Sequence, residues 1–434
     1  MTERPAVIVV GAGIAGLVLA RDLAIADRRV ILLESAARPG GQVAAAGLGG
    51  MDLGADAARS GAALSRLTAE LGLELVSPLD APCRVVLAPG EPRPLPAAHL
   101  SGIPAAPLAR EVIDLIGLRA ALRAQLDALT PMVRAGKYRT LGELVRRRMG
   151  ARVLERLVAP VVRGRSGLHP DDVEPAAASP RLPGALAYGG TLAAAVAAIL
   201  QDRPAGGELL GIRGGMHVLA ETLAARAVRV GVDLRLGTRV EAVEASGVVL
   251  ADGTRLDGRV VLAAPPPDAT AGAQSTHDAH PAPDAHPTPG PREETVVVAE
   301  VESAGLDARP IGGGAVVAAG ATGIAARALT HSSARWPWLG EGLGPHRHLV
   351  RLVYDTAPHD PGAVEADLRA ITGVPAARVV ELEARTWRRA VASAPPRGVL
   401  AVGEAAGHEG ITAAVEHARR IGADLIADDD GSPE

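Results

Sequence analysis

Three glycines near the start of the chain, Gly11, Gly13 and Gly16, have the spacing of a phosphate-binding turn. They follow the apolar run Ala6–Val10, which predicts a buried parallel strand. The first glycine would permit a tight turn, the second a close approach of the backbone to a pyrophosphate, and the third close packing of helix on sheet. A helix over residues 14–26 would then direct its N–H groups and positive dipole end at the phosphates.

Glu34 is the residue expected to bind the sugar of such a nucleotide. It ends a second predicted strand, Val30–Leu33, and lies 18 residues after Gly16, where an acid can accept a hydrogen bond from a ribose 2′-hydroxyl. A carboxylate there repels a 2′-phosphate, so we expect an adenosine without one. The alternative, a glycine-rich turn with no ligand, is disfavoured because strand, glycines, helix, strand and acid occur together.

The residues after Glu34 favour FAD over a nicotinamide nucleotide. The stretch from Ser35 to Gln42 holds the basic Arg38 and then a glycine pair, and Asp52-Leu-Gly-Ala-Asp56 follows. Such a loop can fold back over the adenine and pyrophosphate of a longer dinucleotide. A plain nicotinamide enzyme usually turns directly into another helix at this point.

Length and composition describe an ordinary soluble protein. The 434 residues are 48% hydrophobic with a net charge of -4, enough for two or three domains around a substantial core. The 45 basic residues are offset by 49 acidic ones without a basic block, which argues against nucleic acid. The single cysteine, Cys83, excludes an internal disulfide and fits a reducing compartment. We see no secretory leader and no spanning apolar run, and we expect a cytoplasmic protein without a transmembrane segment.

The order of predicted elements indicates a discontinuous α/β fold. A Rossmann-like FAD-binding domain would combine the chain start with two later blocks, one opening at Gly214 and one at Val399. An antiparallel-sheet substrate domain and an inserted helical subdomain would supply the rest. The expected parts are residues 1–75, 205–265 and 386–429 for the FAD-binding domain, 76–105 and 293–385 for the substrate domain, and 106–204 for the helical subdomain.

Local patterns predict the main helices outside the nucleotide motif. Thr140 and Glu143 have the spacing of a capping box, and the prolines around Arg93 indicate a hairpin at a sheet margin. Ser332, Ser333 and Trp336 are expected on a connecting loop. The predicted helices cover residues 60–72, 108–127, 140–157, 192–200, 214–227 and 413–427.

Residues 266–292 form a low-complexity stretch rich in Pro, Asp and Ala. It contains His277, His280 and His286, which could bind a metal only if every ligand were ordered at once. A flexible loop is the favoured interpretation, and no metal site is predicted.

With these blocks in hand, the chain resembles the protoporphyrinogen/coproporphyrinogen III oxidase family of FAD flavoproteins, in its bacterial branch, over most of its length. The nucleotide motifs alone fit any amine-oxidase-like flavoprotein. Later blocks narrow the resemblance to the porphyrinogen group, namely Arg93–Pro96, Leu144–Gly164, Gly214–Leu219, Ser332–Pro337 and Trp387.

The resemblance implies oxidation of a porphyrinogen in three rounds, each passing a hydride to the flavin, with molecular oxygen as acceptor and hydrogen peroxide as product. Because the cofactor supplies this chemistry, the protein need only orient the macrocycle and exclude water. Coproporphyrinogen III is preferred over protoporphyrinogen IX, since a four-carboxylate substrate needs cationic partners that Arg84, Arg163 and Arg165 could supply. Ferrochelatase or a haem-transfer protein, and peripheral membrane contact, are left open as partners.

The resemblance also implies the residues of the site. Arg84 would face a substrate propionate, or be an exposed hairpin charge, and Arg163-Gly164 would border the substrate, or Gly164 would be a helix C-cap. Trp387 could bind FAD or only anchor the core. The implied FAD contacts are Gly11, Ala12, Gly13, Ile14, Ala15, Gly16, Glu34, Ser35, Arg38, Gly40, Gly41, Gln42, Gly54, Ala55, Asp56, Ala57, Val240, Trp387, Gly403, Glu404, Gly410, Ile411 and Thr412.

Two other functions stay open. A different oxidase or desaturase on the same fold could act on an amine or a polyene, but an amine oxidase would be expected to build an aromatic cage, and the chain has three Tyr and no Phe. The third hypothesis is a non-catalytic flavin-binding protein or haem-pathway partner that has lost turnover.

Overall fold

The first strands and helix form where the glycine pattern predicts them. Strands β1 (Val7–Val10) and β2 (Val30–Leu33) are buried at every position, and helix α1 (Ile14–Ile25) lies between them in sequence. Continuous runs of Val, Ile and Leu suit parallel strands covered on both faces. The computed structural model describes residues 5–79, 82–129, 138–202, 209–265, 292–358, 360–389 and 394–430.

A five-stranded parallel sheet is assembled from three distant stretches of the chain. Its order is β10-β2-β1-β14-β20, with β10 at Asp233–Arg235, β14 at Arg259–Leu262 and β20 at Leu400–Ala401. Every neighbouring pair is parallel. The predicted discontinuous, Rossmann-like α/β fold is therefore confirmed, whereas the exact domain limits stay a prediction.

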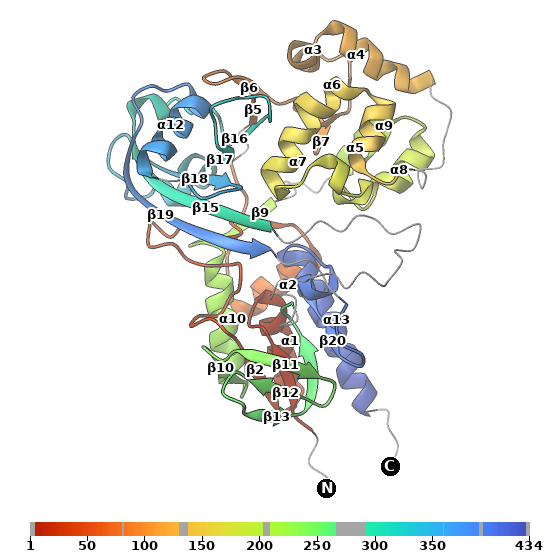
Figure 1. Cartoon of the computed structure of the whole chain (residues 1–434), viewed down its shortest axis with the longest axis vertical. Coiled ribbons are helices and arrows are strands. Elements are labelled where there is room, and N and C mark those ends of the chain that lie inside the picture. The colour runs from red at the N-terminus through yellow and green to blue at the C-terminus, as the bar shows by residue number, and fades with distance from the viewer. Residues whose placement is uncertain are drawn as a thin grey trace.

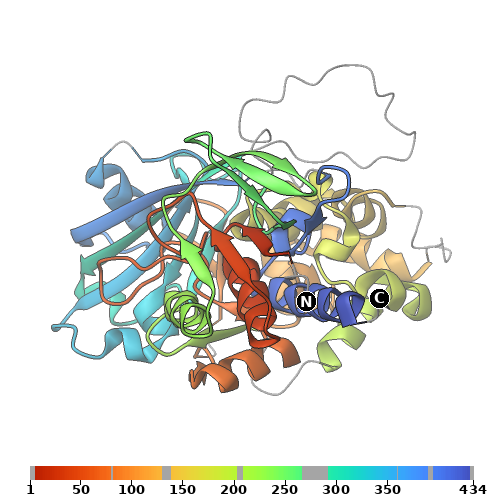
Figure 2. The same cartoon turned by 90° about the horizontal axis from the view of Figure 1, so that it is seen from below.

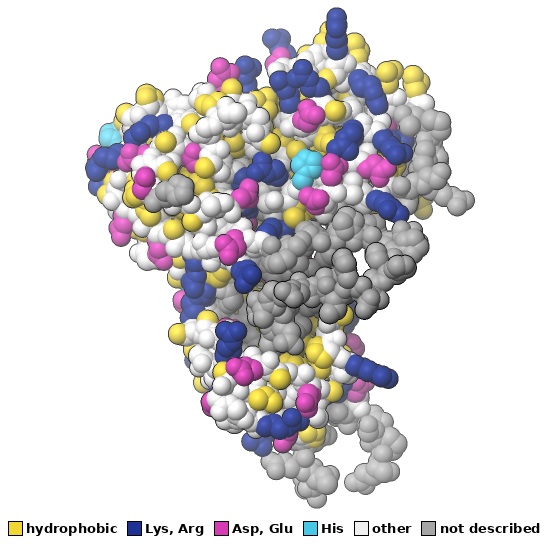
Figure 3. Space-filling model, in the orientation of Figure 1, with side chains coloured by type: hydrophobic (Ala, Val, Ile, Leu, Met, Phe, Trp, Pro, Cys, Tyr) yellow, Lys and Arg dark blue, Asp and Glu magenta, His cyan; other side chains and the backbone are white. Residues whose placement is uncertain are grey.

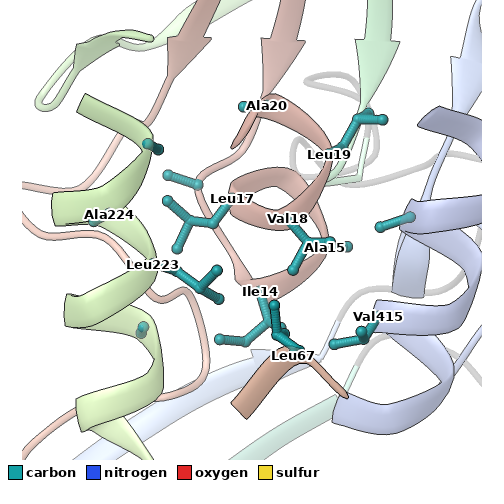
Figure 4. Close-up of a cluster of buried hydrophobic side chains, with 14 of the residues drawn as sticks. Ile14, Ala15, Leu17, Val18, Leu19, Ala20, Leu67, Leu223, Ala224 and Val415 are labelled. Carbon is teal, nitrogen blue, oxygen red and sulfur yellow. The ribbon is translucent and has the colours of Figure 1, made fainter. Parts of the chain in front are cut away.

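Helices cover one face of this sheet and a small antiparallel sheet covers the other (Figure 2). Around α1 stand α2 (Ala62–Leu71), α10 (His217–Arg229) and α13 (Ile411–Asp430). Leu223 of α10 and Val415 of α13 point at α1 from opposite sides (Figure 4). The opposite face packs on β11 (Val240–Glu244), β12 (Gly247–Leu250) and β13 (Arg255–Asp257).

A second, seven-stranded sheet stands above the parallel one (Figure 1). Its order is β19-β15-β18-β17-β16-β5-β6, and all pairs are antiparallel except β16 with β5. The prediction of an antiparallel sheet is confirmed, as is the edge position of the proline-containing β6. The strands are β5 (Arg84–Val86), β6 (Pro92–Pro94), β15 (Arg292–Glu302), β16 (Gly314–Val317), β17 (Ala326–His331), β18 (Arg347–Tyr354) and β19 (Arg378–Arg389), and helix α12 (Pro361–Thr372) packs on one face.

The helical part sits beside this sheet, and two of its predicted helices are broken by glycines. The helix predicted over 108–127 is split at Gly117, whose φ is 84°, and the one over 140–157 is split at Gly150, whose φ is 95°. L-residues rarely adopt such angles, so a continuous helix ends there. The elements are α3 (Arg110–Ile116), α4 (Leu118–Gln125), the 3₁₀ turn η1 (Leu126–Leu129), α5 (Leu141–Arg148), α6 (Ala151–Val153), the π turn η3 (Leu154–Val158), α7 (Ala159–Ser166), α8 (Leu182–Gly189) and α9 (Leu192–Gln201).

Other local predictions had mixed outcomes. The Thr140 hydroxyl accepts from the Glu143 N–H at 3.0 Å, as a capping box requires, but the Glu143 carboxylate accepts from the Arg139 N–H instead. Ser332 and Ser333 lie in a short helix, α11 (Ser332–Arg335), and not in a loop as predicted, with Trp336 directly after it. Short strands β3 (Ala58–Arg59), β4 (Leu75–Val76) and β9 (Leu209–Ile212) form a small sheet, and β7 (His99–Leu100) pairs with β8 (Ile103–Pro104).

Two expectations concern membranes and metals. In the described part of the chain no single helix is long and apolar enough to span a bilayer. The helices α8 and α9 pass that test only together, with a bend of 118°. Their buried residues, Leu182, Leu186, Leu192, Ala195, Val196 and Ile199, pack in the helical core. No group of three or more His, Cys, Asp or Glu among the described residues could hold a metal ion. His277, His280 and His286 lie outside those residues, as does the predicted loop up to residue 291.

Candidate dinucleotide site

The glycine turn after β1 is shaped by close backbone contacts. Gly11 has a φ of 106°, and a Cβ there would lie 2.7 Å from the Ala264 Cβ. A Cβ at Gly16 would lie 2.0 Å from the Gly11 oxygen, so only glycine lets α1 approach the turn this closely. At Gly13, by contrast, a Cβ would meet nothing within 4 Å. Open space therefore stands at the start of α1, where the first N–H groups of a helix have no intrahelical acceptor.

The Glu34 carboxylate is held at the carboxyl end of β2. It accepts from the Ala12 N–H at 2.8 Å and from the Ala36 N–H at 2.8 Å, with the Ser35 hydroxyl at 3.3 Å. The Glu34 carbonyl accepts from the Thr238 N–H at 2.8 Å, which places the chain leading into Val240 and β11 alongside. A fixed carboxylate beside the glycine turn suits a ribose hydroxyl.

The loop after Glu34 folds back onto the glycine turn, and its position over the adenine and pyrophosphate of a dinucleotide stays a prediction. The Gly40 N–H donates to the Ala12 carbonyl at 2.8 Å, and Gly13 and Gly40 form a parallel bridge. A Cβ at Gly41 would lie 3.2 Å from the Gly13 Cα. The two glycine segments thus approach each other at a distance that a bulkier residue would disturb.

Arg38 holds this loop in shape. Its guanidinium donates to the carbonyls of Gly41 at 2.8 Å, Pro39 at 3.0 Å and Val43 at 3.1 Å. Burial, followed by the nearby charge of Arg385, lowers the pKa of Arg38. Three carbonyl acceptors give this guanidinium a clear structural role beside its predicted cofactor contact.

Trp387 on β19 is anchored between two arginines and the loop above them. Its indole N–H donates to the Leu53 carbonyl at 2.8 Å. The guanidinium carbons of Arg385 and Arg38 lie 4.6 and 5.6 Å from the ring centroid, within cation–π range. These contacts support the alternative of a packing anchor, and FAD contact by Trp387 stays a prediction.

The segment Gly54–Ala57 lies directly against the loop. A Cβ at Gly54 would lie 1.5 Å from the Gln42 oxygen, so glycine is required there, and the Arg351 guanidinium donates to the Gly54 carbonyl at 2.8 Å. Ala55 packs on the hydrophobic core around α1, and Ala57 packs on the hydrophobic core around β15. Asp56 lines a small pocket together with Trp336, Trp338 and Arg351.

Asp52 has a structural role that sequence reasoning missed. Its carboxylate accepts from the Met216 and His217 N–H groups at 2.8 and 2.9 Å and lies 2.8 Å from the His217 Nδ1. It therefore caps the start of α10, and its hydrogen bond raises the pKa of His217. No spacing rule connects residues 164 positions apart, so one sequence alone contains no signal for this contact.

The late Gly-Glu turn meets the early glycine turn. The Gln42 amide donates to the Glu404 carboxylate at 2.9 Å, and a Cβ at Gly403 would lie 2.5 Å from the Ala15 Cβ. The Gly403 N–H donates to the His417 Nδ1 at 3.1 Å. Gly410 has a φ of 87° just before Ile411 opens α13, and the Thr412 hydroxyl donates to the Arg59 carbonyl. The predicted residues of the glycine turn, of the loop up to Gln42 and of the late turn at Gly403 thus meet around the start of α1. Asp56, Ala57 and Thr412 contact other parts of the fold.

The residues present fit a flavin dinucleotide. The open space at Gly13 and the helix start suit a pyrophosphate, and two carboxylates, Glu34 and Glu404, flank it. Carboxylates accept hydrogen bonds from sugar and ribityl hydroxyls but repel phosphate oxygens. An anion site between two carboxylates matches FAD, in which the pyrophosphate lies between the hydroxyls of the ribose and those of the ribityl chain.

The predicted substrate residues are only partly brought together. Gly164 lies inside α7, where a Cβ would lie 2.6 Å from Val316 of β16, and the C-cap of α7 is Gly167. The C-cap alternative for Gly164 is therefore wrong, because this glycine permits close packing of helix on sheet. Arg84 and Val85 are neighbours on β5, and successive side chains of a strand point to opposite faces of the sheet. The Val85 side chain packs on the helical core, so Arg84 lies on the face opposite α7.

A chain of four charges joins α7 to the sheet, and sequence reasoning found only its first member. Arg163 donates to Asp355 at 2.9 Å, and Asp355 accepts from Arg327 at 2.7 Å. Arg327 also pairs with Glu294, and both side chains are almost fully buried. Glu294 is the cross-strand partner of Trp387, so the chain of charges runs toward the predicted flavin contact. These four residues lie far apart in the sequence among many other charged residues, so no spacing linked them.

The fold and the site define a dinucleotide-binding α/β protein with a separate antiparallel sheet. Residues 14–294 match the family model for flavin containing amine oxidoreductases, so the chain belongs to that family. FAD is accordingly its cofactor. No curated protein matches the sequence.

Solved structures with the same fold cover almost the whole chain. A candidate protoporphyrinogen oxidase from Exiguobacterium sp. 255-15 is 22% identical with a TM-score of 0.77, covering 99% of this chain and 100% of that one. Putrescine oxidase bound to putrescine is 16% identical with a TM-score of 0.65, covering 98% and 99%. Cyclohexylamine oxidase from Brevibacterium oxydans IH-35A is 17% identical with a TM-score of 0.64, covering 98% and 100%.

Proposed function

We propose that the protein oxidises a porphyrinogen to a porphyrin, with coproporphyrinogen III as the preferred substrate and oxygen as the acceptor. The broader statement, an FAD-dependent oxidoreductase, follows from the family. The narrower one is supported by the better superposition on the candidate protoporphyrinogen oxidase than on the two amine oxidases.

The positions of the three tyrosines argue against an amine substrate. Tyr138 is buried in the helical core, Tyr354 is buried between β18 and α12, and Tyr188 is 95% exposed on α8. The sequence has no Phe. None of these three rings adjoins the glycine turn, so tyrosine and phenylalanine supply no amine cage there, and Trp387 is the single aromatic residue among the predicted flavin contacts.

Carboxylate recognition supports the preference for a four-carboxylate porphyrinogen. Arg163 uses one guanidinium nitrogen toward Asp355 and keeps 29% of its side chain exposed. A guanidinium fork suits a carboxylate, and Arg165 of the same helix is a further candidate, whereas Arg84 lies on the opposite face from α7. Coproporphyrinogen III offers more such groups than protoporphyrinogen IX.

In the proposed reaction FAD would supply the redox chemistry, and the residues of the chain would bind and orient the substrate. When bound, FAD would supply the chemistry of accepting a hydride from the substrate, and molecular oxygen would take up the electron pair as hydrogen peroxide. The chain's own task is to bind and orient the macrocycle: Arg163 would hold a substrate carboxylate, with Asp355 fixing the guanidinium. The buried Arg327–Glu294 pair would keep the sheet below it rigid and dry.

An anaerobic titration tests the proposal. Adding coproporphyrinogen III to the yellow holoprotein should bleach the flavin absorbance while coproporphyrin fluorescence rises, and oxygen should restore the flavin with release of peroxide. The same titration with protoporphyrinogen IX ranks the two substrates, and putrescine tests the amine alternative. A flavin that stays oxidised with every porphyrinogen contradicts the proposal and favours a flavin-binding protein without turnover.

A further inference from the structure

Strand β19 forms one edge of the antiparallel sheet and is long for an edge strand. It has 12 residues and pairs with β15 alone. None of residues 378–388 is buried, whereas β15 is mostly buried. Apart from the ladder with β15, no backbone–backbone hydrogen bond among the described residues involves residues 380–387. A strand with one neighbour presents a row of N–H and C=O groups to a further strand.

The usual devices that block a sheet edge are missing from most of β19. Proteins protect edges with short strands, prolines or a covering element. The opposite edge strand, β6, is three residues long and includes Pro92 and Pro94. β19 contains neither proline nor glycine. Only its beginning is covered, where the Val379 N–H donates to the Glu365 carboxylate of α12 at 2.9 Å.

The charges of β19 have both signs and lie close together. Glu383 and Arg385 are two residues apart, so their side chains share one face of the strand. The Glu383 carboxylate accepts from the Gly47 N–H at 2.7 Å, and the Arg385 guanidinium lies over the Trp387 ring, so both side chains are held in place. Figure 3 shows acidic and basic side chains mixed over the part of the surface that β19 crosses. An edge charged with one sign would repel a second copy of itself, whereas this edge would not.

The order of these charges matches a second copy of the strand in one antiparallel register. Two identical antiparallel strands are related by a two-fold axis, and residues at equal distances from the axis face each other. With the axis at Ala384, each Glu383 faces the Arg385 of the other copy. An axis at either of those two residues would instead place like charges opposite each other. Ala384 is exposed and lies near the middle of residues 380–387, so the overlap of the open edges is nearly complete.

We propose that the chain forms a two-fold homodimer in which the β19 strands of two copies pair antiparallel about Ala384. The two seven-stranded sheets join into one continuous sheet through backbone hydrogen bonds, and two Glu383–Arg385 contacts fix the register. This pairing does not depend on which substrate the enzyme oxidises.

Light scattering during size-exclusion chromatography of the full-length holoprotein tests the proposal. The mass at high protein concentration should approach twice the 44.1 kDa of one chain and decrease on dilution. Ala384→Lys places two like charges on the axis and should weaken association at least tenfold. The matched control, Ala376→Lys, makes the same change at an exposed alanine before β19 and should associate like the unchanged protein.

Charge reversal tests the register. Arg385→Glu alone places glutamates opposite each other, and Glu383→Arg alone does the same with arginines, so each variant should be monomeric. Mixing the two variants should restore a dimer, because every arginine then faces a glutamate of the other chain. Circular dichroism checks that each variant is folded.

Three results overturn the proposal. The first is a holoprotein that stays monomeric at every concentration, and the second is a dimer that Ala384→Lys leaves intact or that the two reversed variants do not restore on mixing. The third is a monomer whose β19 amides gain protection from hydrogen exchange only with a different protein, which would assign the edge to that protein.

Discussion

The side-chain amide of Gln42 donates a 2.9 Å hydrogen bond to the carboxylate of Glu404, across 362 positions of the chain. Gln42 closes the loop over the early glycine turn, and Glu404 opens the late turn before α13. The bond therefore joins the two segments that must grip one dinucleotide. Glu404 is exposed and Gln42 is half-buried, so we expect the pair to affect the cofactor more than the fold.

Glu404→Ala should weaken FAD retention several-fold and change the free energy of unfolding of the apoprotein by less than about 1 kcal/mol, since exposed polar pairs contribute little to stability. Equilibrium dialysis of FAD and urea unfolding measure the two effects. Glu409→Ala removes another exposed carboxylate of the same turn and should leave both unchanged. Equal FAD affinity in Glu404→Ala and the unchanged protein would remove Glu404 from the site.

Gly13→Glu should give a folded, colourless protein. The backbone there has a φ of -70°, which any residue adopts, and a Cβ meets nothing within 4 Å, so folding has no reason to fail. The added carboxylate would occupy the pyrophosphate position and repel phosphate. The measurement is the flavin-to-protein absorbance ratio together with the circular dichroism spectrum.

Gly13→Ala is the control for that substitution, because it adds a single methyl group without charge and should weaken FAD binding far less than Gly13→Glu does. A fully flavinated Gly13→Glu protein would contradict the placement of the pyrophosphate. A misfolded Gly13→Ala protein would show that the space at Gly13 is needed for folding.

Local patterns in the sequence were sufficient for the parts of the fold that one stretch determines. The run Val7–Val10, the glycine turn and Glu34 formed as predicted, because strand, turn and helix signals there are contiguous. Contacts between distant stretches were beyond reach: neither the Asp52 cap of α10 nor the Arg327–Glu294 pair has a spacing that one sequence can reveal. The breaks at Gly117 and Gly150 were missed because periodicity continues through a glycine whose φ is known only from the fold.

Protonation of His417 should loosen the late turn in acid. Its Nδ1 accepts from the Gly403 N–H, which only a neutral ring can do at that nitrogen, and burial followed by the charges of His408 and Arg420 lowers its pKa below the ordinary 6.5. The unfolded chain then binds more protons than the folded one, so this contribution to stability is complete above about pH 6.5 and falls as the pH decreases below it.

The measurement is the difference in unfolding free energy between the unchanged protein and His417→Asn, from urea melts between pH 5 and 7.5. Taking the difference cancels His331, whose pKa of about 4 acts in the same direction, and His217, whose raised pKa acts in the opposite one. The gap between the two proteins should narrow toward pH 5. A gap that is independent of pH would mean that His417 does not titrate in this range.

The buried Arg327–Glu294 pair should be far more costly to break than any surface pair. Glu294→Gln removes the buried carboxylate that pairs with Arg327, and Arg327→Met removes the guanidinium that pairs with Glu294. Each single substitution should lower the free energy of unfolding by about 3–5 kcal/mol. The double variant Arg327→Met/Glu294→Gln should recover part of that loss, since no unpaired charge remains, although Asp355 then keeps only Arg163.

The matched control is Arg255–Glu244, an exposed pair at 3.0 Å, where the same substitutions should cost less than about 1 kcal/mol. Equal losses from the two pairs would contradict the proposed role of the Arg327–Glu294 pair in holding the sheet rigid beneath the substrate.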